Sequence, residues 1–203
     1  MNYILSFWGL LVDRLDFWEI WRSVLGRSDF VNEISHFVNE VNMAGFEIPL
    51  KAVARIFASK TGKNPTELTR RFIEKTMSQL TPKPCVIDFL RSIKGDGKVA
   101  ILSNTPCRCF IELFLSKWSV EADLVITSDI ILRRKPSRAV FKYALRRLGT
   151  EPHEVIYIGD SEEDLGAMGV GLFTIIVGSY GGHVNFPSLC ELQNWLIENL
   201  GKN

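Results

Sequence analysis

Short apolar runs in the second half of the chain alternate with segments of helical spacing. A strand covered on both faces appears as a continuous apolar run, and such runs predict buried strands at 98–102, 123–127, 155–158 and 172–177. A further strand is expected at 3–7, and helical spacing predicts helices at 85–93, 106–118, 137–148, 161–168 and 188–200. Strands that alternate with helices indicate βαβ units. We therefore expect an α/β fold, with a Rossmann-like parallel sheet covered by helices on both faces.

The segment between residues 14 and 80 contains helical spacing and no strand signal. Its apolar positions predict helices at about 15–25, 30–44, 50–60 and 64–80. Asn64 is a favourable N-cap for the last of these helices, and Pro65 suits its first position. We therefore expect a small all-helical cap domain at 14–80, inserted after the first strand, and a core domain formed by 1–13 and 81–203.

Composition narrows the class of protein only slightly. The 203 residues include 24 basic and 23 acidic side chains, a balance that indicates neither a nucleic-acid binder nor a membrane-surface protein. No apolar run reaches the length of a membrane span, and the first residues lack the basic start and cleavage site of a signal peptide. The four cysteines (Cys85, Cys107, Cys109 and Cys190) are too sparse for a disulfide framework, so we expect a cytoplasmic protein.

Polar side chains follow the predicted strands at the edge where ligands bind in open α/β sheets. Ser103 and Asn104 come directly after the strand at 98–102 and lead into a helix. A hydroxyl group and free backbone N–H groups at a helix start form a site for an anion. Simple capping of that helix by either side chain is the alternative explanation.

Lys135 stands directly before a proline, which favours an extended backbone at this position. Its long cationic side chain can then reach the same anion as Ser103. The alternative is that Lys135 belongs to a solvated basic run with Arg133, Arg134 and Arg138.

Four acidic side chains follow the strand at 155–158, within the segment 159–164. Asp160 and Asp164 are four residues apart, so at a helix start they lie near one face. Two converging carboxylates suit a hard cation such as Mg²⁺. Stabilisation of the helix N-terminus by acidic side chains is the competing explanation.

The order and spacing of these segments resemble the haloacid dehalogenase-like (HAD) superfamily, most of whose members are Mg²⁺-dependent phosphohydrolases. The resemblance rests on residues 101–106, on the Lys-Pro pair at 135–136 and on residues 159–164. The helical segment at 14–80 occupies the place of the small cap of that family.

The resemblance implies a role for each of the polar residues. Ser103 and Asn104 would bind the phosphoryl group, and Lys135 would neutralise its charge. Asp160 and Asp164 would hold Mg²⁺.

The first motif departs from that family pattern. The first strand of the family ends in Asp-x-Asp, in which the first Asp is the nucleophile and the second is the general acid and base. Counting back from Gly9 places Ser6 and Trp8 at these two positions. Serine is a poor nucleophile without a base, and tryptophan transfers no proton at a useful pKa. The loss of a carboxylate also predicts weak Mg²⁺ binding.

We therefore expect a catalytically impaired protein with the fold of a HAD hydrolase, acting in binding or regulation. The sequence is compatible with three partners: a small phosphorylated molecule, a protein partner or a second copy of the chain. Neither nucleic acid nor a membrane is expected as a partner. The alternative is a Mg²⁺-dependent phosphohydrolase of small phosphate esters with non-standard chemistry, in which Ser6 or a water attacks the phosphate.

Overall fold

The computed structural model describes residues 1–26 and 29–200. Within these ranges a six-stranded parallel sheet has the order β3-β2-β1-β4-β5-β6. Its strands are β1 (Asn2–Leu5), β2 (Val99–Ser103), β3 (Leu124–Thr127), β4 (Val155–Gly159), β5 (Phe173–Val177) and β6 (Val184–Phe186). The predicted parallel sheet is confirmed. The exception is β6, whose three residues form no apolar run and which the sequence did not predict.

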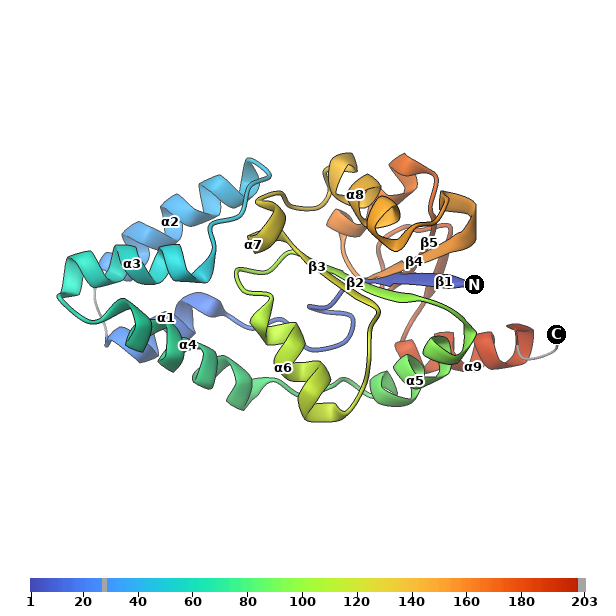
Figure 1. Cartoon of the computed structure of the whole chain (residues 1–203), viewed down its shortest axis with the longest axis horizontal. Coiled ribbons are helices and arrows are strands. Elements are labelled where there is room, and N and C mark those ends of the chain that lie inside the picture. Colours follow the sequence, from blue (N-terminus) through green and yellow to red (C-terminus); the bar gives the residue numbers. More distant parts are fainter. Residues whose placement is uncertain (27–28, 201–203) are drawn as a thin grey trace.

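Helices cover both faces of this sheet, as predicted (Figure 1). The core helices are α5 (Val86–Asp96), α6 (Cys109–Trp118), α7 (Ser128–Ile131), α8 (Arg138–Leu148) and α9 (Leu189–Leu200), with the 3₁₀ helices η1 (Pro152–Glu154) and η2 (Glu162–Val170). Tyr3 and Leu5 of β1 pack in the apolar cluster that includes α5, α6 and α9, whereas Ile4 packs with α8 and η2. Successive strand residues therefore bury side chains on opposite faces.

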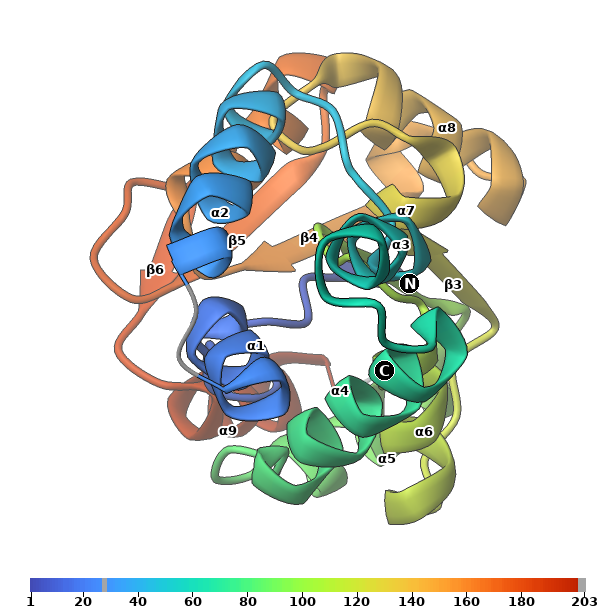
Figure 2. The same ribbon diagram turned by 90° about the vertical axis from the view of Figure 1, so that its left-hand side faces the viewer.

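The described part of residues 14–80 contains four helices joined by non-helical connections, and the sequence predicted these helices. These are α1 (Phe17–Leu25), α2 (Asp29–Met43), α3 (Leu50–Thr61) and α4 (Pro65–Gln79), and they lie together beyond one end of the sheet (Figures 1 and 2). Asn64 caps α4 as expected, because its Oδ1 accepts the N–H groups of Thr66 and Glu67 at 2.8 and 3.2 Å. Along the described chain, no helix has the length and apolarity needed to cross a bilayer.

The segment after β4 differs from its prediction, because η2 is a 3₁₀ helix where an α-helix was expected. Gly166 lies so close to the chain before α8 that an added Cβ would fall 2.4 Å from the Pro136 carbonyl oxygen. Glycine permits this approach but weakens an α-helix. Packing against α8 therefore outweighs the helical spacing of the sequence.

The cysteines also differ from the expectation. Cys85 and Cys190 form one disulfide, with 5.3 Å between their Cα atoms, and Cys107 and Cys109 form another. The first joins the N-terminal ends of α5 and α9, which are 105 residues apart in sequence. A pairing over such a distance leaves no local spacing signal, so the cysteine count alone did not indicate it.

Replacing Cys190 by serine is expected to lower the free energy of unfolding by about 2–4 kcal/mol, because the bond closes a long loop in the unfolded chain. Urea unfolding of oxidised protein measures this loss. The matched control is Cys107→Ser, which opens a bond between residues only two positions apart and releases little chain entropy. An unchanged urea midpoint for oxidised Cys190→Ser contradicts the expected role of the pairing.

Candidate functional site

A cavity of about 220 Å³ lies at the C-terminal ends of β1, β2 and β4, next to the start of α1. Five of the predicted site residues line it: Ser6, Trp8, Ser103, Asn104 and Lys135. The cavity is also lined by Arg14, Leu15, Phe17, Arg134, Ser161 and Glu163. The fold therefore gathers at one place most of the residues that the sequence singled out.

Lys135 lies at the base of this cavity, and its side chain is almost fully buried. Its ammonium group donates to Ser6 Oγ at 3.0 Å, to Tyr157 Oη at 3.2 Å and to Asp164 Oδ1 at 2.5 Å. A lysine has three N–H donors, so these contacts use all of them. Sequence reasoning missed Tyr157, whose polar group is hidden within the apolar run of β4.

Asp164 is fully buried, and both of its oxygens are engaged by neighbouring groups. Oδ1 accepts from Lys135 and Tyr157, and Oδ2 accepts the N–H groups of Asp160 and Ser161 at 2.9 and 3.1 Å. With Ser161 it forms a capping box at the start of η2. Burial raises the pKa of Asp164, but the Lys135 charge and the hydrogen bonds outweigh it and hold the pKa below its ordinary value.

Asp160 makes a different contact from the one predicted. Its Oδ2 accepts from Nη2 of Arg14 at 2.7 Å, and its Oδ1 is buried without a hydrogen-bond partner. Burial raises the pKa of Asp160, and the Arg14 charge offsets only part of that rise. Sequence reasoning missed Arg14, because nothing in the local pattern links it to a carboxylate 146 residues away.

Asn104 is engaged by the chain segment that carries Lys135. Its Oδ1 accepts the Lys135 N–H at 2.8 Å, and its Nδ2 donates to the Lys135 carbonyl at 3.1 Å and to Glu163 Oε2 at 2.9 Å. The carboxamide therefore positions the main chain of Lys135. Ser103 also lines the cavity, and anion binding by Asn104 and Ser103 stays a prediction.

Glu47 connects the helical segment at 14–80 to the chain around the sheet and was not singled out in the sequence. It lies between α2 and α3 with its side chain buried, and it accepts from Ser128 Oγ at 2.6 Å and from Nη1 of Arg134. Burial raises the pKa of Glu47 above its ordinary value, although the Arg134 charge opposes this rise. Ser128 in turn accepts the N–H of Thr105 at 2.8 Å, so the network reaches the loop that follows β2.

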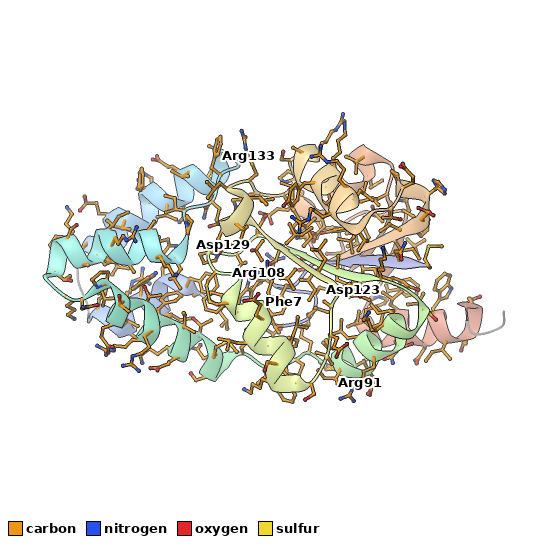
Figure 3. The ribbon with its side chains drawn as sticks, in the orientation of Figure 1. Phe7, Arg91, Arg108, Asp123, Asp129 and Arg133 are labelled. Carbon is orange, nitrogen blue, oxygen red and sulfur yellow. A yellow bond between two sulfur atoms is a disulfide. The ribbon has the colours of Figure 1, made fainter. Side chains whose placement is uncertain are left out.

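Trp8 forms an aromatic wall of the cavity. Its ring packs edge to face against Phe7, Phe17 and Phe110, with centroid separations of 5.1, 5.2 and 6.1 Å. Phe7, labelled in Figure 3, in turn contacts Phe114 of α6 at 5.3 Å. The indole N–H is buried without a hydrogen-bond partner, so Trp8 contributes apolar surface to the site.

A second cavity, of about 240 Å³, is lined in part by residues of α1, α2, α3 and α4 and has a more apolar lining. Trp18, Trp21, Val38, Val53 and Phe72 contribute to its wall. It shares the lining residues Leu15, Phe17, Asn104 and Arg134 with the first cavity. The two chambers therefore adjoin each other, and the second is the more apolar of the two, although polar residues such as Asn39 and Glu47 also line it.

The residues present do not fit a resident Mg²⁺ ion. Mg²⁺ needs oxygen ligands in octahedral geometry, usually with one or two carboxylates free to bind it. Asp164 is occupied by Lys135 and the η2 turn, and the Asp160 oxygen that has a partner is bound to Arg14. Over residues 1–26 and 29–200, no group of three or more His, Cys, Asp or Glu side chains is arranged to hold a metal.

Replacing Asp164 by asparagine is expected to cost about 3–5 kcal/mol in the free energy of unfolding, because it leaves the Lys135 charge buried without its counterion. Urea unfolding measures the loss, and the double variant Asp164→Leu with Lys135→Met should recover part of it. The control is Lys60→Met, which removes an exposed ion pair with Glu33 worth less than about 1 kcal/mol.

The stability of the Asp164→Asn variant is also expected to depend on pH less than that of the wild type. A carboxyl whose folded pKa lies below its ordinary value, here 3.8, stabilises the fold above that value and loses this contribution as the pH falls through the folded pKa. Between pH 6 and about pH 3 the wild type should therefore lose more stability than Asp164→Asn. Equal acid sensitivity of the two proteins contradicts the assigned pairing.

Known proteins that are similar to this chain include a nucleotidase, a phosphatase and a haloacid dehalogenase. The chain is 28% identical over 123 residues to pyrimidine 5'-nucleotidase YjjG of Escherichia coli, covering 58% of this chain and 54% of the relative. It is 27% identical over 120 residues to phosphoglycolate phosphatase 1 of Pseudomonas aeruginosa, covering 58% and 44%. A third relative, (S)-2-haloacid dehalogenase 4A of Burkholderia cepacia, is 29% identical over 136 residues, covering 61% and 59%. The chain thus spans about half the length of the curated relatives it matches.

Solved structures show the same fold along nearly the whole chain. A 2-haloacid dehalogenase from Pseudomonas syringae superimposes with a TM-score of 0.73 at 15% identity, covering 97% of this chain and 98% of that one. A HAD phosphatase from Thermococcus onnurineus superimposes with a TM-score of 0.69 at 24% identity, covering 96% and 97%. Residues 9–177 also match the sequence model of one family. On that match, the chain belongs to the haloacid dehalogenase-like hydrolases.

Proposed function

We propose that this chain binds a small anionic molecule in the cavity at the strand ends, and that it acts in binding or regulation without aspartyl-phosphate chemistry. The observation that carries the proposal is the environment of Ser6, which stands where the family has its nucleophile. Lys135 donates a hydrogen bond to Ser6 and also donates to Tyr157 and Asp164. A lysine whose three donors are all in use does not take the Ser6 proton, so the hydroxyl has no activating base.

The position of the acid and base supports the same proposal. Trp8 replaces the second aspartate of the family pattern, and its indole is packed among aromatic rings. Burial as part of an apolar cluster fixes the ring and leaves it unable to exchange a proton with a leaving group. The chain therefore lacks the aspartate nucleophile and the aspartate acid and base of the family pattern.

The lining of the cavities indicates the class of ligand. Arg14, Arg134 and the Ser103 hydroxyl face the polar chamber, which favours a phosphate or carboxylate group. The names of the relatives, phosphoglycolate phosphatase and 2-haloacid dehalogenase, specify small molecules with these groups. The adjoining apolar chamber suits a short aliphatic or aromatic body attached to the anion.

The second candidate function is a Mg²⁺-dependent phosphohydrolase with non-standard chemistry. It is favoured by Ser6 Oγ, which lines the cavity together with Ser103. It requires Ser6 or a water to attack the phosphate and predicts that Ser6→Ala abolishes turnover. An unchanged rate in that variant removes Ser6 as the nucleophile.

Partners and cellular location also remain proposals. A protein partner or a second copy of the chain suits a regulatory role, and we retain a cytoplasmic location. The two disulfides are the contrary observation, since thiols in most cytosolic proteins stay reduced.

Purified wild-type protein is expected to show no Mg²⁺-dependent turnover of a panel of phosphate monoesters, whereas Ser6→Asp with Trp8→Asp should gain it. The double variant restores the nucleophile and the acid and base, and the carboxylate that Ser6→Asp introduces adds negative charge that attracts a metal against the repulsion of Arg14. Release of inorganic phosphate measures the gain. The control is Ser6→Asn with Trp8→Asn, which has similar side-chain size without carboxylates. Robust wild-type turnover that Asp160→Ala abolishes contradicts the proposal.

Binding provides a separate test. Isothermal titration should detect phenyl phosphate binding to the wild type, and Ser103→Ala should weaken it about tenfold through the loss of one hydrogen bond to a charged group. Ser35→Ala is the control, because that exposed hydroxyl bonds only to its own helix. Equal affinities in wild type and Ser103→Ala place the ligand outside this cavity.

A further inference from the structure

We propose that Arg14 is the resident cation of this site: the anion binds without a divalent metal, and Arg14 and a metal exclude each other at Asp160. The first statement, that an anion binds without a metal, rests on the proposed function above. The second statement, that Arg14 excludes a metal from Asp160, does not depend on the ligand, so an experiment can contradict one statement without the other.

The contact between Arg14 and Asp160 places a positive charge where the acidic turn meets the cavity. Nη2 of Arg14 lies 2.7 Å from Asp160 Oδ2, and the Asp160 side chain is 11% exposed. Arg14 lines the same cavity as Ser6 and Ser103. A divalent ion at this carboxylate would lie next to a guanidinium group, and the repulsion between them opposes its binding.

Gly9 shows that the fold is built around this contact. An added Cβ at Gly9 would fall 2.0 Å from Asp160 Oδ2 and 2.8 Å from Arg14 Nε. The glycine also has a φ of +88°, a conformation that residues with side chains rarely adopt. Both the space and the backbone conformation at Gly9 therefore accommodate the pair.

The other two cations of the cavity are held by buried carboxylates. Lys135 is saturated by Ser6, Tyr157 and Asp164, and Arg134 is bound to Glu47. Arg14 differs because about half of its side chain, 54%, is exposed. A guanidinium has five N–H donors in a planar fork, so Arg14 can hold Asp160 and still donate to a phosphate or carboxylate in the cavity.

Removal of the Arg14 side chain leaves Asp160 without its cationic partner. Its Oδ1 is already buried without a hydrogen-bond partner. Without the guanidinium, a largely buried carboxylate is left with neither oxygen bound to a cation. A metal ion then meets no competing charge from Arg14, and weak binding of a divalent cation should appear.

Arg14→Met tests the proposal, because methionine keeps an unbranched apolar stem and removes the charge. Arg22→Met is the matched control, since Arg22 forms an exposed pair with Glu19 on α1 and does not line the cavity. Inorganic phosphate binding is measured by isothermal titration in EDTA and in MgCl₂. Mn²⁺ binding is measured by electron paramagnetic resonance.

The wild type should bind phosphate with the same affinity in both buffers and should not bind Mn²⁺ at this site. Arg14→Met should bind phosphate about tenfold more weakly in EDTA. It should also gain Mn²⁺ binding, which the added change Asp160→Asn should remove. Arg22→Met should behave as the wild type in each measurement.

Phosphate binding by the wild type that EDTA abolishes overturns the inference and leaves the proposed function standing. Mn²⁺ binding to the wild type that Asp160→Asn removes overturns it as well. An Arg14→Met variant that neither loses phosphate affinity nor gains Mn²⁺ also overturns it. Absence of phosphate binding in both buffers overturns the proposed function and, with it, anion binding without a metal. The Mn²⁺ measurement then decides whether Arg14 excludes a metal from Asp160.

Discussion

The buried ion pair of Lys135 and Asp164 holds together the segments that form the site. Two charges removed from water are tolerated only when each finds its full set of partners. The partners come from four segments of the chain. Ser6 follows β1 and Tyr157 lies in β4, whereas Lys135 precedes α8 and Asp164 lies in the first turn of η2. The same hydrogen bonds that satisfy the charges thus fix four parts of the chain at one point of the sheet edge.

The same pair bears on the function that we propose. Lys135 lies between Ser6 and the buried Asp164, and its three donors are all in use. Trp8 adds an aromatic wall to the same cavity. The cations of the cavity, its serine residues and the adjoining, more apolar chamber are the features that support ligand binding in this proposal.

Sequence patterns predicted the features that depend on local order. The strands of the parallel sheet are buried on both faces, and so β2, β4 and β5 were visible as apolar runs. The N-cap Asn64 was equally local. Ser6, Ser103 and Lys135 were found through their places relative to strand ends and the family resemblance, and the fold does bring them to one cavity.

Contacts between distant segments lay beyond the reach of such patterns. Arg14 meets Asp160 across 146 residues, and Glu47 meets Arg134 across 87. Neither pair has a fixed spacing or a favoured neighbour that a single sequence reveals. Asp164 illustrates a related limit, because its spacing from Asp160 was compatible with both a metal site and a helix start, and the sequence favoured the metal site. Only its partners, Lys135 and the η2 turn, distinguish the two.

The contact between Glu47 and Arg134 has a consequence for ligand binding. Glu47 belongs to the connection between α2 and α3, whereas Arg134, its partner, precedes α8 and lines both chambers. A ligand anion that accepts hydrogen bonds from the Arg134 guanidinium shares these donors with Glu47. The affinity of the cavity for an anion and the anchoring of the α2–α3 connection therefore depend on the same side chain.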